Sequence, residues 1–162
     1  MTLRSFWGRV ATVTALAVSL GLALSPPHPP ARVPATVATA LGVAAGAVLF
    51  ATAVRRRPRL TRLGVGAAAV ARQLFLGLCA ANEEVLWRRV LLGELLPAGG
   101  LTALAISSVG FAAAHRRARP LHALTGLTFG AVYLATGVLA ASIAAHWAYN
   151  ALVGSVAERR PP

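Results

Sequence analysis

Two adjacent glutamates, Glu83 and Glu84, are the residues of this 162-residue chain whose type and setting point most directly to chemistry. The sequence holds only four acidic residues, and these two lie between apolar runs. A carboxylate in apolar surroundings costs free energy unless it is paired with a cation or has a functional role. On a helix, Glu84 and Arg88 stand at positions i and i+4 with the acid first, the favourable order for an ion pair. Glu83 points about 100° away around the helix axis, so we predict a structural role for Glu84 and a chemical role for Glu83.

Three other polar residues occur where they could reach the same site. His115 closes an apolar run, and His146 and Asn150 stand four residues apart in the last apolar run. On a helix that spacing projects both side chains from one face into one cavity. Counted at about 1.5 Å per residue, Glu83, His115 and His146 all fall near the middle of a membrane core about 30 Å thick. We therefore expect these side chains to meet.

This set of residues suits the hydrolysis of a peptide bond inside a membrane. Such a reaction needs an activated water, a base that takes its proton, and hydrogen-bond donors for the oxyanion. Glu83 can serve as the base, and His115 can hold the water against it. His146 and Asn150 can supply the donors. The set Glu83, His115 and His146 could instead bind zinc, because one glutamate and two histidines form a known zinc hydrolase ligand set. The sequence leaves metal-free and zinc-assisted activation open.

Apolar helices must position these residues. With 57% hydrophobic residues the chain is too apolar for a soluble domain of its length, and it is long enough for about six membrane crossings. We therefore predict an all-α fold, a multi-pass transmembrane helical bundle of about six spans. The spans are expected at residues 10–24, 36–54, 72–96, 101–115, 121–136 and 138–157, with a Pro-rich loop at 25–34 and an interfacial piece at 63–71.

Arginine placement gives the expected orientation. All 16 basic residues are arginines, and 12 of them fall in the N-terminal segment, the second and fourth loops and the C-terminus. The loops on the other side hold only Arg32. This positive-inside asymmetry predicts a protein of the cell membrane, in contact with the lipid bilayer, with both termini in the cytoplasm. Because the arginines lie between apolar runs, we expect no nucleic acid partner.

Several other features receive no chemical role. The first apolar run is short and follows arginines, so a cleaved signal peptide is an alternative to the retained first helix that we favour. Cys79, the single cysteine, is interpreted as a small buried hydrophobic residue. His122 is expected at the membrane interface. Trp147 and Tyr149 are expected at the interface or in packing, with the cavity around the last polar pair as an alternative place.

Three motifs follow one another on separate predicted helices: Glu83-Glu84-x-x-x-Arg88, Phe111-x-x-x-His115 and His146-x-x-x-Asn150. In this order they resemble the CPBP family of intramembrane proteases, which includes the type II CAAX prenyl endopeptidases, the bacteriocin-processing and self-immunity proteins, and the abortive-infection proteins. The likeness covers about residues 70–155. We accordingly divide the chain into an N-terminal two-helix membrane segment at 1–62 and a CPBP-like protease core at 63–158.

The resemblance implies roles for three pairs of residues: water activation by Glu83 and His115, oxyanion stabilisation by His146 and Asn150, and bracing of the site by Glu84 and Arg88. The chain departs from the family at Arg89, where the family usually has glycine, and we expect this arginine to alter helix packing or substrate entry. The N-terminal portion is short, so elements that grip the substrate in the prenyl endopeptidases could be missing. The predicted function is an intramembrane endopeptidase acting on a membrane-associated peptide or protein.

Two other functions stay open. One is a non-catalytic immunity protein of the same fold that binds a partner, which would be expected to lack a motif residue, although none is lacking. The other is a small proton-coupled transporter in which Glu83 and the histidines relay protons. Such a transporter would be expected to show broken helices or paired repeats, and the sequence shows neither. A composition rich in Ala, Arg, Gly and Pro and devoid of lysine suggests a bacterial source.

Overall fold

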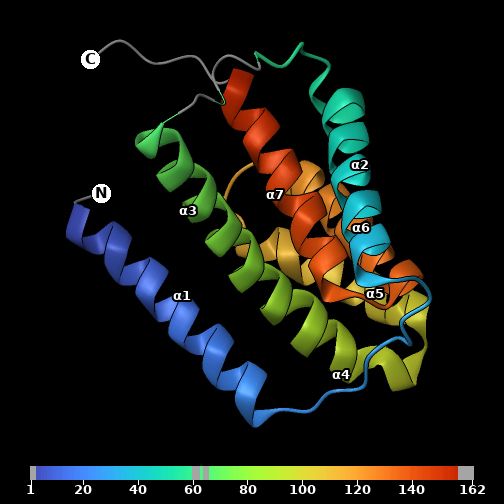
Figure 1. Ribbon diagram of the computed structural model, residues 1–162. Helices are drawn as coiled ribbons and strands as arrows, with labels where there is room; N and C mark the ends of the chain where they lie inside the picture. Colours follow the sequence, from blue (N-terminus) through green and yellow to red (C-terminus); the bar gives the residue numbers. More distant parts are fainter. Residues whose placement is uncertain (1–2, 60–62, 64–65, 157–162) are drawn as a thin grey trace.

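Helices joined by short loops make up the described part of the chain, which in the computed structural model comprises residues 3–59, 63 and 66–156 (Figure 1). Their bounds are α1 Leu3–Ala23, α2 Ala35–Val54, α3 Ala67–Glu84, the π-helix η2 Val85–Leu92, the short α4 Gly93–Leu95, the 3-10 helix η3 Leu96–Ala98, α5 Gly100–Ala114, α6 Arg119–Thr136 and α7 Leu139–Val156. No strand occurs among these residues, so the all-α prediction is confirmed for them. The expected end of the last helix at residue 157 and the arginines at 62, 159 and 160 lie outside the described residues.

The third predicted helix differs most from the structure. The sequence suggests an interfacial piece at 63–71 and an α-helix at 72–96, whereas α3 begins at Ala67 and changes into the π-helix η2 after Glu84. A π-helix forms hydrogen bonds from i to i+5, is rare, and is frequent at functional sites. Here it follows the paired glutamates directly. The apolar pattern does not predict it, because the residues from Val85 to Leu92 are apolar apart from two arginines and so mark no single face.

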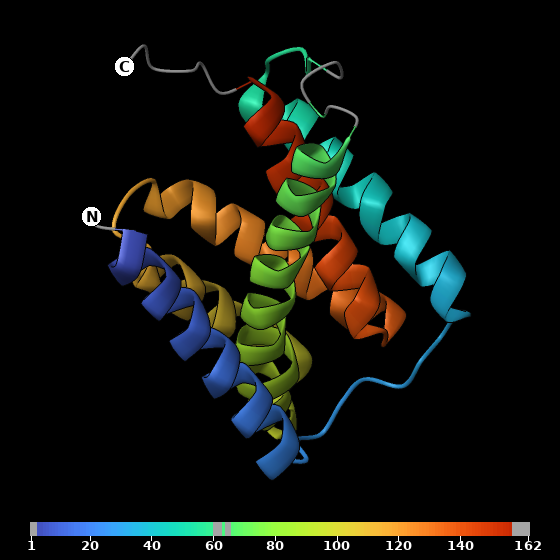
Figure 2. The ribbon, with the colours of Figure 1, turned by 60° about the vertical axis from the view of Figure 1, so that its left-hand side comes forward.

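Glycines allow α2 and α7 to pack closely, and the two helices lie side by side in both views (Figures 1 and 2). A Cβ atom on Gly42 would lie 2.1 Å from the carbonyl oxygen of Ala141, and one on Gly46 would lie 2.2 Å from that of Ala145. Both distances are far shorter than a van der Waals contact, so the α2 backbone touches α7 directly at these positions. The contact fixes how far α7 can slide or turn relative to α2.

The Pro-rich stretch between α1 and α2 is non-helical, as predicted, and is docked on the helix ends. The backbone N–H of Arg32 donates to the carbonyl of Thr136 over 3.0 Å. Gly137 has a φ of +70°, and a Cβ there would lie 2.0 Å from the carbonyl oxygen of Pro30. Helix α1 itself lies along α3 (Figure 2), where Asn82 Nδ2 donates to Thr14 Oγ1 over 2.7 Å.

One described helix, α2, is both long and apolar enough to cross a membrane. Two shorter apolar stretches, Val10–Ala23 and Gly100–Ala114, fall below that length. The arrangement of about six spans therefore stays a prediction, as does the retention of the first helix.

Replacing Gly46 by valine should destabilise the fold, because the new side chain would overlap the α7 backbone. Overpacking of this kind costs about 1–3 kcal/mol. We expect a lower midpoint of thermal unfolding in detergent micelles. The matched control is Gly154→Ala, since a Cβ on Gly154 meets no atom within 4 Å. Equal unfolding midpoints for wild type, Gly46→Val and Gly154→Ala would contradict the close packing of α2 on α7.

Candidate active site

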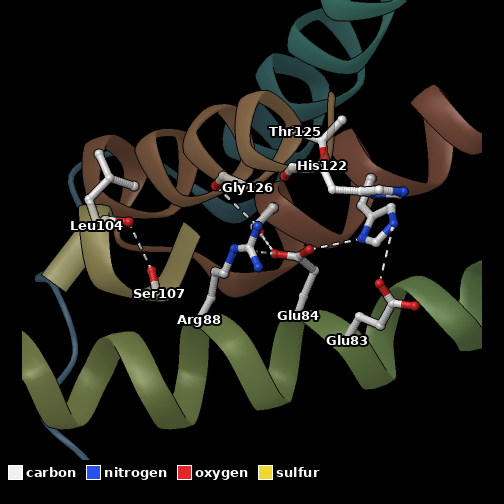
Figure 3. A network of polar contacts seen from close by, with 10 residues as sticks. Glu83, Glu84, Arg88, Leu104, Ser107, His122, Thr125 and Gly126 are labelled. Atoms are coloured by element: carbon white, nitrogen blue, oxygen red, sulfur yellow. Dashed lines mark hydrogen bonds and ion pairs between the residues drawn. The ribbon is translucent and has the colours of Figure 1, made fainter. Parts of the chain in front are cut away.

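The Glu84 carboxylate is buried and satisfied from two sides (Figure 3). Its Oε2 atom lies 3.1 Å from Nε of Arg88, which confirms the ion pair predicted from the i, i+4 spacing. Helix α7 supplies two further donors: Ser142 Oγ donates to Oε2, and His146 Nδ1 donates to Oε1 over 2.9 Å. No local spacing predicts this contact of Ser142, because Glu84 lies 58 residues away in the chain.

Arg88, whose side chain is fully buried, extends this network to α5 and α6. Its Nη2 donates to the carbonyl of Gly126 over 3.1 Å. The guanidinium carbon lies 4.9 Å from the centroid of the Phe111 ring and 5.9 Å from that of Phe129, distances that allow cation–π attraction. One ion pair therefore holds α3, η2, α5, α6 and α7 in a fixed relation.

His146 lies between the two glutamates, and Figure 3 shows contacts from one imidazole to both carboxylates. Its Nδ1–H donates to Glu84, and its Nε2 lies 3.9 Å from Oε2 of Glu83. The ring stacks on Phe129 with centroids 4.7 Å apart. The family resemblance implies that His146 donates a hydrogen bond to an oxyanion. Since Glu84 already receives the Nδ1–H, a second N–H at Nε2 exists only in the doubly protonated ring.

A cavity of about 110 Å³ gathers the residues predicted to be catalytic. It is lined by Glu83, Phe111, His115, Leu121, His122, Thr125, Phe129, His146, Tyr149 and Asn150. The structure thus brings Glu83, His115, His146 and Asn150 around one space, while their individual roles stay predictions. Tyr149 belongs to this cavity, which was one of its two expected places.

His115 enters the cavity wall from the end of α5. It is the C-cap residue, with extended backbone angles of φ −97° and ψ 124°. Its Nδ1 lies 2.7 Å from the carbonyl oxygen of Phe111. A carbonyl only accepts, so Nδ1 carries the hydrogen and Nε2 carries the lone pair. An imidazole fixed in this tautomer can accept a hydrogen bond from a water.

His122 lines the cavity and has a partner that no local spacing indicated, whereas its position relative to the membrane stays a prediction. Its ring stacks on that of His115 with centroids 3.8 Å apart and planes 18° apart. A short turn causes this: Ala118 adopts a left-handed φ of 53°, and α6 then starts at Arg119. The chain reverses within a few residues, which places the first turn of α6 over the end of α5. A spacing of seven residues across a proline gave no local signal of that reversal.

The ligand set proposed for zinc does not fit one ion. Among the described residues, no group of three or more His, Cys, Asp or Glu side chains is arranged to hold a metal. Glu83, His115 and His146 share the cavity wall, and the hydrogen bonds of the two Nδ1 atoms leave both Nε2 atoms open to a ligand, but the three side chains are not grouped closely enough to hold one ion. Zinc binding by these three residues is therefore not supported.

A larger groove of about 740 Å³ runs between α3 and α7, but it has a different character. Its walls are almost all apolar and contain neither carboxylate nor imidazole, although Gln73 and Thr39 contribute polar atoms. Trp147 lines this groove and not the cavity. Chemistry needs the polar groups of the smaller cavity, so the smaller cavity is the candidate active site.

Arg89, the departure from the family pattern, binds the loop between α1 and α2. Its Nη1 donates to the carbonyl of Pro26 over 2.6 Å, in the loop between α1 and α2. A Cβ on the neighbouring Gly93 would lie 2.7 Å from the carbonyl oxygen of Pro27, so the loop lies directly on this part of the helix. Arg89 therefore fastens the loop to η2, and its partners Pro26 and Tyr133 do not line the cavity.

Arg88→Ala should destabilise the protein strongly, because it leaves Glu84 buried without its counter-ion. Breaking a buried pair in this way costs about 3–5 kcal/mol. Thermal unfolding in micelles and the amount of folded protein in membranes measure the effect. Arg89→Ala is the matched control, since it removes hydrogen bonds to Pro26 and Tyr133 but leaves no buried charge unpaired, and it should cost only about 1–2 kcal/mol. Wild-type stability of Arg88→Ala would show that Glu84 does not depend on this partner.

Comparison with known proteins adds independent information on the family. A family model described as type II CAAX prenyl endopeptidase Rce1-like matches residues 66–152, more than half of the chain. No curated protein and no solved structure matches the chain. The matched segment contains all three motifs and every residue that lines the cavity. The chain therefore belongs to the Rce1-like type II CAAX prenyl endopeptidases of the CPBP family, a family of membrane-embedded proteins.

Proposed function

We propose that the protein is an intramembrane endopeptidase that hydrolyses a peptide bond in a membrane-associated substrate through a water activated by Glu83 and His115. The observation that supports the proposal is the shared cavity of about 110 Å³. It is lined by the carboxylate of Glu83, the imidazole of His115 in a fixed tautomer, and the side-chain amide of Asn150. Such a space holds a water and the carbonyl of a scissile bond. The family assignment supports a CAAX-type peptidase as the class of enzyme.

Glu83 acts as the proton acceptor. Its side chain is about one-third exposed, in contrast to the buried Glu84, so it can reach a water in the cavity. The water donates one hydrogen bond to the carboxylate of Glu83 and another to Nε2 of His115. As the water oxygen forms its bond to the carbonyl carbon, its proton passes to Glu83. When the carbon–nitrogen bond breaks, Glu83 returns that proton to the leaving amine.

Asn150 and His146 serve the opposite side of the scissile carbonyl. The side-chain amide of Asn150 donates to the oxyanion that forms when water attacks, and donors of this kind lower the barrier by stabilising charge present only in the transition state. His146 adds a second donor from Nε2 when its ring is doubly protonated. Glu84 and Arg88 brace His146 from behind and do not touch the reacting atoms.

The protein is further proposed to cross the cell membrane several times, with both termini in the cytoplasm. The arginine distribution and the membrane-embedded family support this arrangement. Its substrate would be a membrane-associated peptide or protein whose cleaved bond reaches the cavity.

Glu83→Gln should lower turnover by at least about 10²-fold while the protein still folds, because glutamine keeps the shape but takes no proton. The readout is cleavage of a library of membrane-anchored peptides by the purified full-length protein. Glu94→Gln is the matched control, since Glu94 is exposed in α4 and should change turnover by less than about twofold. Equal cleavage by wild type and Glu83→Gln would refute the assignment of the base.

The same assay with a chelator tests the alternative chemistry. We expect undiminished turnover, since Glu83 and His115 supply the proton acceptor and the anchor of the water. Loss of activity that added zinc restores would instead assign the water to a metal ion.

Topology is tested by placing a tag at each terminus of the full-length protein in oriented membranes. Both tags should be accessible from the cytoplasmic side alone, because arginine-rich segments are retained there. Labelling of either tag from the outer side would contradict the proposed orientation.

A further inference from the structure

Three histidines line the cavity, and His122 is the one that has no role in the proposed reaction. Its ring lies against His115, with centroids 3.8 Å apart and planes inclined by 18°, and it meets the ring of Phe111 edge-on at 6.0 Å. We propose that His122 is a positioning residue that holds the ring of His115 in the orientation needed to anchor the water. This inference rests on the proposed function and names a residue that the three sequence motifs do not include.

His115 needs such support because of its place in the fold. It stands where α5 ends, its own backbone is extended, and the following residues of the loop are exposed. The hydrogen bond from Nδ1 to the carbonyl of Phe111 fixes one atom of the ring but leaves the ring plane free to tilt about that bond. Contact with the flat face of His122 restricts this tilt. Together the two contacts set the direction of Nε2.

Two hydrogen bonds fix the backbone of His122 in the first turn of α6. Its backbone N–H donates to the carbonyl of Ala118 over 3.0 Å, which closes the first turn of α6. Its carbonyl accepts a hydrogen bond from Thr125 Oγ1, also over 3.0 Å. The left-handed Ala118 directs this turn back over α5. The support for His115 is thus built on a helix and not on a loop.

Stacking, and not a hydrogen bond, is the interaction through which His122 acts. Within the described residues its ring makes no side-chain hydrogen bond, whereas its face is in contact with His115. A planar ring of similar size should therefore replace it. A side chain of similar volume without a planar ring should not.

This difference defines the experiment. His122→Phe keeps a flat ring, whereas His122→Leu fills a similar volume without one. Leu124→Ala is the control, because Leu124 is exposed on the same helix and does not line the cavity. Each full-length variant is labelled with ¹⁵N at histidine and purified in micelles. Nuclear magnetic resonance then gives the tautomer of each imidazole, and the signals of His115 are identified by their loss in His115→Gln.

We expect wild type, His122→Phe and Leu124→Ala to show His115 with its hydrogen on Nδ1. His122→Leu should show a mixture of tautomers, because a ring that tilts freely loses its hydrogen bond to Phe111 for part of the time. In the peptide-cleavage assay, His122→Leu should lose about 10- to 100-fold in kcat with little change in KM, the penalty expected for a misplaced catalytic group. His122→Phe should stay within about threefold of wild type, because the ring of His115 keeps its place. If His122→Leu does not fold, His122→Ala takes its part in both measurements.

Two results would overturn the proposal. One is an unchanged tautomer of His115 together with unchanged kcat in His122→Leu. The other is equal loss of activity in His122→Phe and His122→Leu, which would assign the work to a nitrogen of His122. Failure of the proposed function is distinguishable, because it appears as wild-type cleavage by Glu83→Gln or as no cleavage at all, and the tautomer measurement depends on neither.

Discussion

The buried carboxylate of Glu84 is the constraint on which the rest of the structure depends. A charge removed from water must be matched by a counter-ion and by hydrogen bonds, or the fold loses several kcal/mol, about 3–5 when one partner is missing. Arg88 supplies the charge from one turn further along, and Ser142 and His146 supply donors from α7. Because these donors stand on another helix, satisfying Glu84 fixes the register of α7 against α3.

That register also creates the cavity. Glu83 precedes Glu84 by one residue and therefore leaves the helix in a different direction, about 100° around its axis. The imidazole that binds Glu84 through Nδ1 presents Nε2 toward Glu83, at 3.9 Å. Adjacent residues of the same type thus take different parts: Glu84 is buried and holds the helices, and Glu83 is partly exposed and faces the cavity. His146 therefore belongs both to the buried network around Glu84 and to the proposed catalytic site.

Packing away from the cavity keeps α7 in that position. The direct contact of the α2 backbone with α7 at Gly42 and Gly46 leaves no room for α7 to shift sideways. On the other flank, the loop after α1 is fastened by Arg89 to η2 and by the backbone of Arg32 to the end of α6. An arginine where the family usually has glycine therefore has a structural partner in this chain.

Features that lie within a single helix could be predicted from the amino-acid sequence. The apolar runs and their proline and arginine boundaries predicted most helices to within a few residues. The i, i+4 spacing predicted the pairing of Glu84 with Arg88, because a helix fixes that distance without help from the rest of the chain. Three motifs in order identified the family.

The way in which the helices face one another could not be predicted from the sequence and is known from the fold. The bond between His146 and Glu84 joins residues 62 apart, and the stack of His122 on His115 depends on a left-handed turn at Ala118. The π-helix after Glu84 is likewise absent from the apolar pattern. These features depend on how neighbouring helices are rotated and at what angle they cross. The packing of all their side chains together sets that rotation and that angle, whereas residue spacing describes one helix alone.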